Sequence, residues 1–238
     1  MFVYRRYCLV LISLFVLFWA SLAIAPYDRG DWLLENVLSF VFVPLVVASF
    51  WVLPLSRVSY TLIFLFMCLH SLGAHYTYAE VPYDAWSRSL FGASVNELMG
   101  WQRNHFDRMV HFSYGLLLAY PVRELFFRVA NARGFWSYFL PLDVVMSTSM
   151  LFELIEWGVA VQVGGDLGIA YLGTQGDVWD AHKDMALASL GALLAMLATM
   201  ALNRALQHDF AREWQDSLRV KIRAPLGERA IARFLRRR

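Results

Sequence analysis

Six long apolar runs constrain this chain more than any other feature of its sequence. They cover approximately residues 7–25, 36–53, 58–76, 107–129, 137–161 and 183–202. Each is close to the roughly 20 residues that an α-helix needs to cross a bilayer. Charged residues make up only 17% of the 238 residues, against about 25% in soluble domains. We therefore predict an all-α, polytopic membrane helix bundle with about six transmembrane helices.

The first run also resembles a cleavable signal peptide, because the segment ASLAIA at residues 20–25 ends in an A-x-A pattern. Its apolar stretch is long, and Pro26 would follow the cut, which disfavours cleavage. We favour an uncleaved membrane anchor. The rest of the predicted topology is the same in both cases.

The lysines and arginines predict which way the bundle faces, since cytoplasmic loops of membrane proteins are enriched in them. With a cytoplasmic N-terminus, 16 of the 21 basic residues fall on the inner side, ten of them after residue 203. Both termini are therefore predicted to be cytoplasmic. We divide the chain into a six-helix transmembrane domain, residues 1–203, and a basic cytoplasmic tail, residues 204–238. The tail mixes arginine with apolar side chains, which suits a segment resting on anionic lipid.

Acidic and histidine side chains gather at the predicted outer ends of four helices, and residues three, four or seven apart share a helix face. The sets that share a face are Asp107 with His111, Glu153 with Glu156, and Asp177 with Asp180 and Asp184. Thr174 is predicted to cap the helix that carries the last set. His70 and His75 are five residues apart and point in different directions, and we favour His75 because it is nearer the surface.

Ionisable groups inside a bilayer are costly and normally face the bundle interior, where they find partners. We therefore predict that these helix ends form one polar pocket that opens toward the periplasm. The candidate pocket residues are His75, Tyr83, Asp84, Arg103, Asp107, Arg108, His111, Glu153, Glu156, Gln175, Asp177, Asp180, Lys183 and Asp184. Carboxylates outnumber basic side chains in this set, so a positive group or a set of protons must balance them.

Three arrangements would balance the carboxylates, and the sequence leaves all three open. They are a bound divalent metal ion, a set of shared protons, and pairing with Arg103, Arg108, Lys183 and water. The candidate metal ligands are Asp107, His111, Glu153, Glu156, Asp180 and Asp184. The chain contains no H-E-x-x-H or zinc-ribbon spacing that would identify a metal.

Four segments of the chain resemble the YjdF-type family of bacterial inner-membrane proteins. They are GAHYTY (73–78), FDRMVHFSYGLLL (106–118), ELIEW (153–157) and LGTQGDVWDAHKDM (172–185). The resemblance implies a multi-pass protein of the bacterial inner membrane and supplies no biochemical reaction. A more distant likeness to VanZ-like membrane proteins rests on Asp107 with His111, and loosely on the later acidic residues.

These observations leave three functional hypotheses. In the first, the pocket of a binding or transport protein holds a cation, protons or a small cationic ligand. In the second, a metal-assisted membrane hydrolase or transferase acts on lipid or envelope substrates, with Glu153 or Glu156 as base and Arg103 or Arg108 steadying a phosphate. In the third, the acids only set helix register in a structural or accessory membrane protein.

Membrane lipids are the expected partners of this chain in each hypothesis. A net charge of +2 gives no indication of nucleic-acid binding. The identity of a small-molecule ligand, the presence of a homo-oligomer and the question of enzymatic activity stay open.

Overall fold

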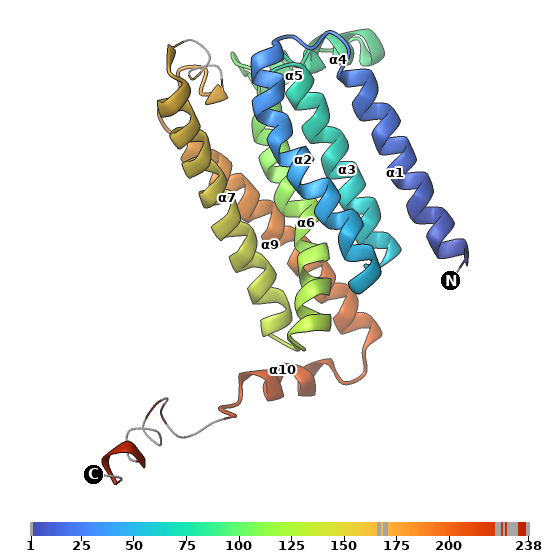
Figure 1. Cartoon of the computed structure of the whole chain (residues 1–238), viewed down its shortest axis with the longest axis vertical. Coiled ribbons are helices and arrows are strands. Elements are labelled where there is room, and N and C mark those ends of the chain that lie inside the picture. Colours follow the sequence, from blue (N-terminus) through green and yellow to red (C-terminus); the bar gives the residue numbers. More distant parts are fainter. Residues whose placement is uncertain are drawn as a thin grey trace.

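The computed structural model describes residues 2–165, 168, 171–221, 225, 227 and 233–236. The long helices are α1 (Phe2–Leu22), α2 (Arg29–Val52), α3 (Arg57–His75), α6 (Phe106–Val129), α7 (Trp136–Val163) and α9 (Asp180–Leu206). The short helices are α4 (Tyr83–Phe91), α5 (Val95–Met99) and α10 (Phe210–Leu218). The long helices stand side by side in one bundle (Figure 1). The predicted all-α membrane bundle is thus confirmed.

Among the described residues, five helices are long and apolar enough to cross a membrane, namely α1, α2, α3, α7 and α9. The remaining long helix, α6, has sufficient length at 24 residues. It does not reach the same hydropathy because it carries charged side chains at both ends, Asp107 and Arg108 at one and Arg123, Glu124 and Arg128 at the other. Since α6 packs on α3, α7 and α9, we treat it as the central helix of a six-helix bundle.

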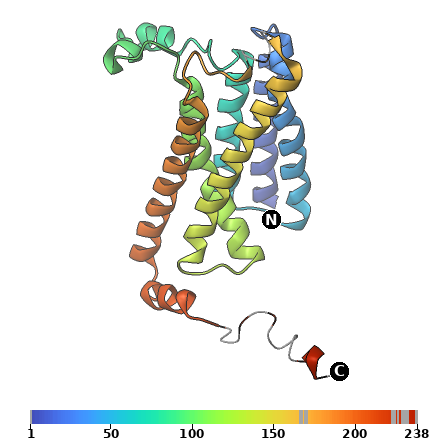
Figure 2. The same ribbon diagram turned by 90° about the vertical axis from the view of Figure 1, so that its left-hand side faces the viewer.

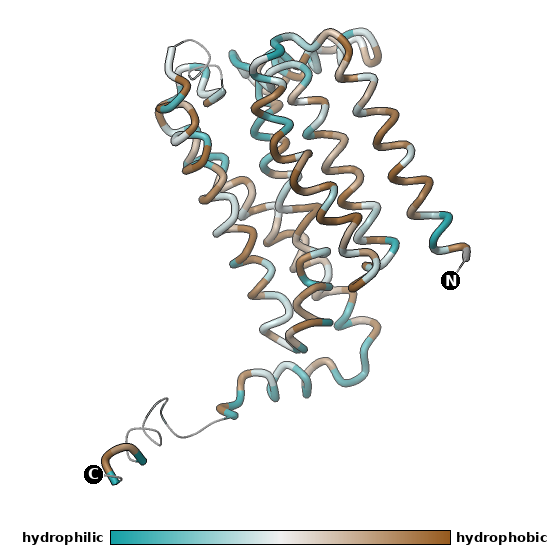
Figure 3. The backbone as a smooth tube through the Cα atoms, in the orientation of Figure 1, coloured by the Kyte–Doolittle hydropathy of each residue, from teal (hydrophilic) through white to brown (hydrophobic). Residues whose placement is uncertain are grey.

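The two ends of the bundle differ in what they carry. Helices α4 and α5 lie at one end, which we call the α4/α5 end, and the start of α1 and helix α10 lie at the other (Figure 1). Teal, hydrophilic segments gather at both ends, and the helix walls between them are mostly brown and hydrophobic (Figure 3). This banding is what a bilayer requires of a spanning bundle. The membrane side that each end faces stays a prediction.

Helix α2 begins earlier than the apolar run indicated. The Asp28 side chain caps it by accepting a hydrogen bond from the Asp31 N–H at 2.8 Å, so the helix starts at Arg29 rather than near Asn36. The two added turns place Asp31 and Glu35 on the helix, where both side chains are buried.

Helices α6 and α9 cross at two glycines. A Cβ atom added to Gly115 would lie 1.9 Å from the carbonyl oxygen of Ala188, and one added to Gly191 would lie 2.1 Å from that of Phe112. Small residues let membrane helices approach to backbone contact. This contact places the N-terminal turns of α6 and α9 next to each other at the α4/α5 end.

Helix α9 ends at Leu206, and α10 folds back beneath the bundle (Figure 2). The Trp214 ring of α10 lies against the rings of Phe135 and Tyr138, with centroids 5.6 and 6.1 Å apart. The Ser217 hydroxyl accepts a hydrogen bond from the Phe135 N–H at 3.0 Å. The first part of the predicted tail therefore packs against the start of α7.

Candidate functional site

Two groups of polar side chains occupy the α4/α5 end of the bundle. The ion-pair layer consists of Arg103, Arg108, Asp177, Asp180 and Lys183. The buried cluster consists of Asp107, His111, Glu153, Glu156 and Asp184. Asp180 and Asp184 are one helical turn apart on α9, so this one helix contributes a carboxylate to each group.

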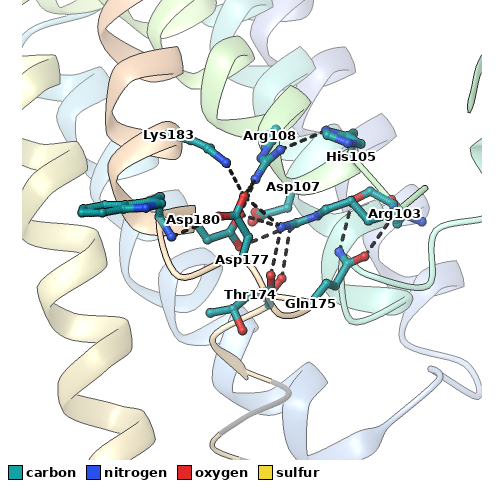
Figure 4. Close-up of polar contacts among 12 residues, drawn as sticks. Arg103, His105, Asp107, Arg108, Thr174, Gln175, Asp177, Asp180 and Lys183 are labelled. Carbon is teal, nitrogen blue, oxygen red and sulfur yellow. Dashed lines mark hydrogen bonds and ion pairs between the residues drawn. The ribbon is translucent and has the colours of Figure 1, made fainter. Parts of the chain in front are cut away.

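Arg103 holds the loop that leads into α9. Its guanidinium donates to the Thr174 carbonyl at 2.9 Å and to both Asp180 oxygens at 2.9 and 3.2 Å (Figure 4). Gln175 strengthens the same contact. Its Oε1 accepts from the Asn104 N–H at 3.0 Å, and its Nε2 donates to the Asn104 carbonyl at 3.1 Å. Both side chains therefore join this loop to the segment that precedes α6.

Asp177 is surrounded by donors. Its Oδ2 accepts from Arg108 and from Lys183, and its Oδ1 accepts from the Trp179 N–H at 3.0 Å (Figure 4). These hydrogen bonds, that from Lys183 first, hold the pKa of Asp177 well below its usual range. Asp177 is therefore an ionised anchor of the loop.

The predicted helix cap at Thr174 is wrong. Helix α9 begins at Asp180, and no side chain caps its first turn. Asp177 lies in the turn before the helix, where its N–H donates to the Thr174 carbonyl at 2.8 Å. The three aspartates therefore do not form one helical stripe: only Asp180 and Asp184 share the helix.

Asp180 was a candidate metal ligand, and the structure gives its carboxylate to two arginines instead. Its side chain is 3% exposed, and it accepts from Arg103 as described and from Arg108 at 2.8 Å. All three basic residues of the ion-pair layer bond to Asp177 or Asp180. Within the described part of the chain, no lysine or arginine ion pair reaches a carboxylate of the buried cluster.

The buried cluster brings side chains from three helices together. Asp107 and His111 lie one turn apart on α6, with 3.5 Å between Asp107 Oδ1 and His111 Nε2. From α7, Glu153 Oε1 lies 3.6 Å from the same nitrogen. Asp107, His111 and Asp184 each offer one ligand atom, and these atoms lie within 4.8 Å of one another. Neighbouring ligand atoms on one metal at about 2.0–2.6 Å lie roughly 3–4 Å apart, so small side-chain movements would bring these three atoms onto one ion.

Two oxygens of the buried cluster have no hydrogen-bond partner. They are Glu153 Oε1 and Asp184 Oδ1, and both atoms are buried. Asp184 as a whole is only 2% exposed, and His111 is 8% exposed. Nearly all buried polar atoms in proteins are bonded, so each exception requires a reason. A cation or a shared proton held by the cluster would satisfy both oxygens.

His70, and not His75, lies near the site. This contradicts the preference for His75 that was drawn from the sequence. His75 Nδ1 contacts the Leu22 carbonyl at 2.7 Å and lies beside α1. His70 is 2% exposed, and its two ring nitrogens contact the Tyr78 hydroxyl and, at 3.2 Å, the Glu35 carbonyl. The sequence favoured His75 for its position nearer the surface, and the packing of α3 against α2 places His70 in the bundle interior instead.

Tyr83 and Asp84 also lie outside the buried cluster. Asp84 accepts from the Ser94 hydroxyl at 2.7 Å and from the Asn96 N–H at 2.9 Å, which lowers its pKa. The Tyr83 hydroxyl donates to the Asn96 side chain at 2.6 Å and accepts from the His105 N–H at 3.1 Å. These two candidates therefore hold α4 and α5 together and attach them to the start of α6.

Sequence reasoning missed Asp31, Glu35 and Tyr78. Asp31 and Glu35 are 1% and 6% exposed, and they are spaced four residues apart, as Asp107 and His111 are. This four-residue spacing could have identified Asp31 and Glu35 as a pair on one helix face. They were missed because the helix was predicted to begin after both residues. Tyr78 is buried with a left-handed backbone, φ 53°.

A cavity connects Glu35, His70 and Tyr78 with Asp107, His111 and Glu156 of the buried cluster. Its volume is about 550 Å³, within the usual range of ligand pockets of about 300–1,000 Å³. Its polar lining comprises Glu35, His70, Tyr78, Asp107, His111, Glu156 and Tyr171 at the α4/α5 end, and most of its remaining lining is apolar.

Membrane-spanning helices that bring together carboxylates and a histidine, without a lysine or arginine partner in the described ranges, define a polytopic membrane protein with a buried ionisable site. The chain belongs to the family described as "Predicted membrane protein (DUF2238)", whose profile matches residues 7–205. It is 38% identical over 175 residues to "Inner membrane protein YjdF" of Escherichia coli (strain K12), covering 73% of this chain and 79% of that protein. No solved structure matches this chain.

Proposed function

We propose that this protein binds a divalent metal ion through Asp107, His111 and Asp184, with Glu153 as a fourth ligand, at the periplasmic side of the inner membrane. The observation that carries the proposal is the meeting of three ligand atoms within 4.8 Å, with the buried Asp184 Oδ1 left without a partner. A cluster of acidic side chains would by itself be weak evidence for a metal site. The orphaned oxygen of Asp184 is a second observation, and a bound cation would satisfy it.

Charge balance supports the same proposal. The buried cluster holds four carboxylates, and the basic side chains nearby are bonded to Asp177 and Asp180. An aspartate inside a membrane-spanning helix costs about 2.5–3.5 kcal/mol at the bilayer centre on insertion scales. A divalent cation would neutralise two of these charges and satisfy both orphaned oxygens at once.

The donor set narrows the choice of metal. Imidazole suits zinc, iron, copper and nickel, and carboxylates suit magnesium, calcium and manganese. A mixed set of one imidazole and three carboxylates therefore favours Zn²⁺, Mn²⁺ or Fe²⁺ over Ca²⁺ and Mg²⁺. Three protein ligands leave the fourth position of Zn²⁺ open for water or a substrate, and four ligands leave open positions only on an octahedral ion such as Mn²⁺.

The test is elemental analysis of the detergent-purified protein, followed by chelation and calorimetric titration with Zn²⁺ and Mn²⁺. We expect about one metal per chain in the wild type, and loss of that metal in Asp184→Asn and His111→Gln. Asp84→Asn is the matched control, because this carboxylate lies at the same end outside the cluster. Absence of metal from the wild type, or equal loss in all three variants, would refute the proposal.

A second candidate function is hydrolysis or group transfer at the same metal. One observation favours it: the cavity that reaches Asp107 and His111 also reaches Glu156. With a metal bound there, Glu156 would serve as the base that takes a proton from the attacking water and returns it to the leaving oxygen of the substrate. Glu156→Gln would then keep the metal and abolish turnover.

A further inference from the structure

The cavity beneath the buried cluster runs along the helices for most of the membrane thickness. Its lining extends from Glu35 on α2 to Leu53, the residue that follows this helix, and on α6 from Asp107 to Leu125. Each stretch corresponds to about 27 Å at 1.5 Å per residue. The hydrocarbon core of a bilayer is about 30 Å thick, so the cavity is a groove parallel to lipid chains.

The groove has one polar end and one apolar end. Asp107, His111, Glu156 and His70 line the α4/α5 end, whereas the deeper walls are mainly aliphatic and aromatic, with the hydroxyl side chains of Ser49, Thr148 and Ser149 among them. Ion pathways through membranes are marked by Asp, Glu, Lys, Arg or His side chains, and the deeper walls of this cavity carry none of them. This lining fits an amphiphile with one charged end and a hydrocarbon chain.

The groove opens sideways between α2 and α7. Helix α2 packs on α3, and α7 packs on α6 and α9, with no close packing between α2 and α7 in the described ranges. Both helices nevertheless line the groove, α2 with Leu45 and α7 with Val144. Leu45 is 61% exposed, so the α2 side of the groove is open to the surrounding lipid. An amphiphile from the bilayer can enter there without passing through water.

The residues at the polar end of the groove determine which charged group of an amphiphile can bind there. A metal held by Asp107, His111 and Asp184 keeps open coordination positions, which anionic oxygens fill. Arg108 lies beside this end, and its buried Nε has no hydrogen-bond acceptor. Phosphate oxygens are strong acceptors for guanidinium groups and good ligands for hard metals. Without the metal, the same carboxylates would repel a phosphate.

We infer that the groove binds one hydrocarbon chain of a phosphate-bearing lipid, with the phosphate on the metal and the chain between α2 and α7. The inference rests on the proposed metal site and adds the class of ligand. The occupant comes from the membrane, because the groove is apolar over most of its length and opens toward lipid.

The test is binding of dioleoyl phosphatidic acid to delipidated, metal-loaded protein in dodecyl maltoside. The comparison ligands are dioleoyl phosphatidylcholine and glycerol 3-phosphate. We expect phosphatidic acid to bind at least tenfold more tightly than either, and chelation to remove that preference. Leu45→Trp and Val144→Phe, which narrow the groove from opposite walls, should each weaken binding at least tenfold. Leu33→Trp is the matched control, since Leu33 is 51% exposed on α2 and does not line the groove.

The outcomes separate the two proposals. Metal-loaded protein that binds phosphatidic acid no better than glycerol 3-phosphate would overturn the lipid groove and leave the metal site standing. Equal affinity in Leu45→Trp, Val144→Phe and the wild type would also overturn it. Protein without metal by elemental analysis would overturn the metal site. If phosphatidic acid still binds after chelation, its phosphate does not contact the metal. This result would overturn the inference that the phosphate lies on the metal.

Discussion

Gly115 of α6 lies directly against the backbone of Ala188 in α9, so that a Cβ at Gly115 would be 1.9 Å from the Ala188 carbonyl oxygen. No side chain fits in that space. The contact lies one turn below His111 and Asp184 on their respective helices, so it sets the distance between the two sides of the buried cluster.

We therefore predict that Gly115→Ala lowers the free energy of unfolding by about 1–3 kcal/mol, the usual cost of overpacking, and weakens metal binding by separating α6 from α9. Unfolding in mixed micelles and calorimetric metal titration provide the measurements. Gly158→Ala on α7 is the control, because a Cβ there meets nothing within 4 Å. Equal effects of the two substitutions would contradict the close crossing.

Asp180→Asn should destabilise the protein by about 3–5 kcal/mol, the cost of removing one partner from a buried ion pair. The substitution leaves the Arg103 and Arg108 guanidinium groups without their buried carboxylate. The control is Glu97→Gln, which removes an exposed ion pair with Arg88 and should cost at most about 1 kcal/mol. We also expect Asp180→Asn to retain metal, and loss of metal from this variant would place Asp180 among the ligands.

The lowered pKa of Asp177 predicts a pH dependence of stability. The folded state holds this carboxylate ionised below its unfolded pKa of about 3.9. The stabilisation from its donors is therefore fully present above about pH 4 and is lost as the pH falls further toward the folded pKa. Unfolding of the wild type and of Asp177→Asn should differ at pH 7, and the difference should shrink below pH 4. A difference that grows on acidification would show the opposite sign of the shift.

Removal of the metal should lower the thermal stability of the wild type. A ligand present at 100 times its Kd stabilises the folded state by about 2.7 kcal/mol. Chelation should therefore shift the melting temperature of the wild type and leave that of Asp184→Asn unchanged. If chelation shifts both proteins equally, the metal acts elsewhere.

Orientation in the membrane is testable with single cysteines. We expect Glu97→Cys, at the α4/α5 end, to react with an impermeant maleimide in intact cells, and Gln207→Cys, after α9, to react only after lysis. Both positions are exposed. The native Cys8 and Cys68 are half-buried in helices and would be replaced by alanine. The reverse pattern of labelling would place the buried cluster at the cytoplasmic side.

Much of the fold and part of the site followed from local sequence properties. Run length and apolar content predicted the membrane helices, because a bilayer demands about 20 apolar residues for each crossing. The pairing of Asp107 with His111 was also predictable, since a spacing of four places two side chains on one helix face. The start of α2 was not predicted, because the Asp28 cap extends the helix into a polar segment, and Asp31 and Glu35 were missed with it.

The sequence by itself determined that acids and imidazoles gather at one end of a membrane bundle. Tertiary structure decided which of them are neutralised: Arg103 and Arg108 reach Asp180 across 77 and 72 residues of chain, whereas Glu153 and Asp184 keep unpartnered oxygens. It also decided that His70 and not His75 faces the cavity. The physical reason is that composition and periodicity act within one helix, whereas the pairing of charges depends on how closely different helices pack.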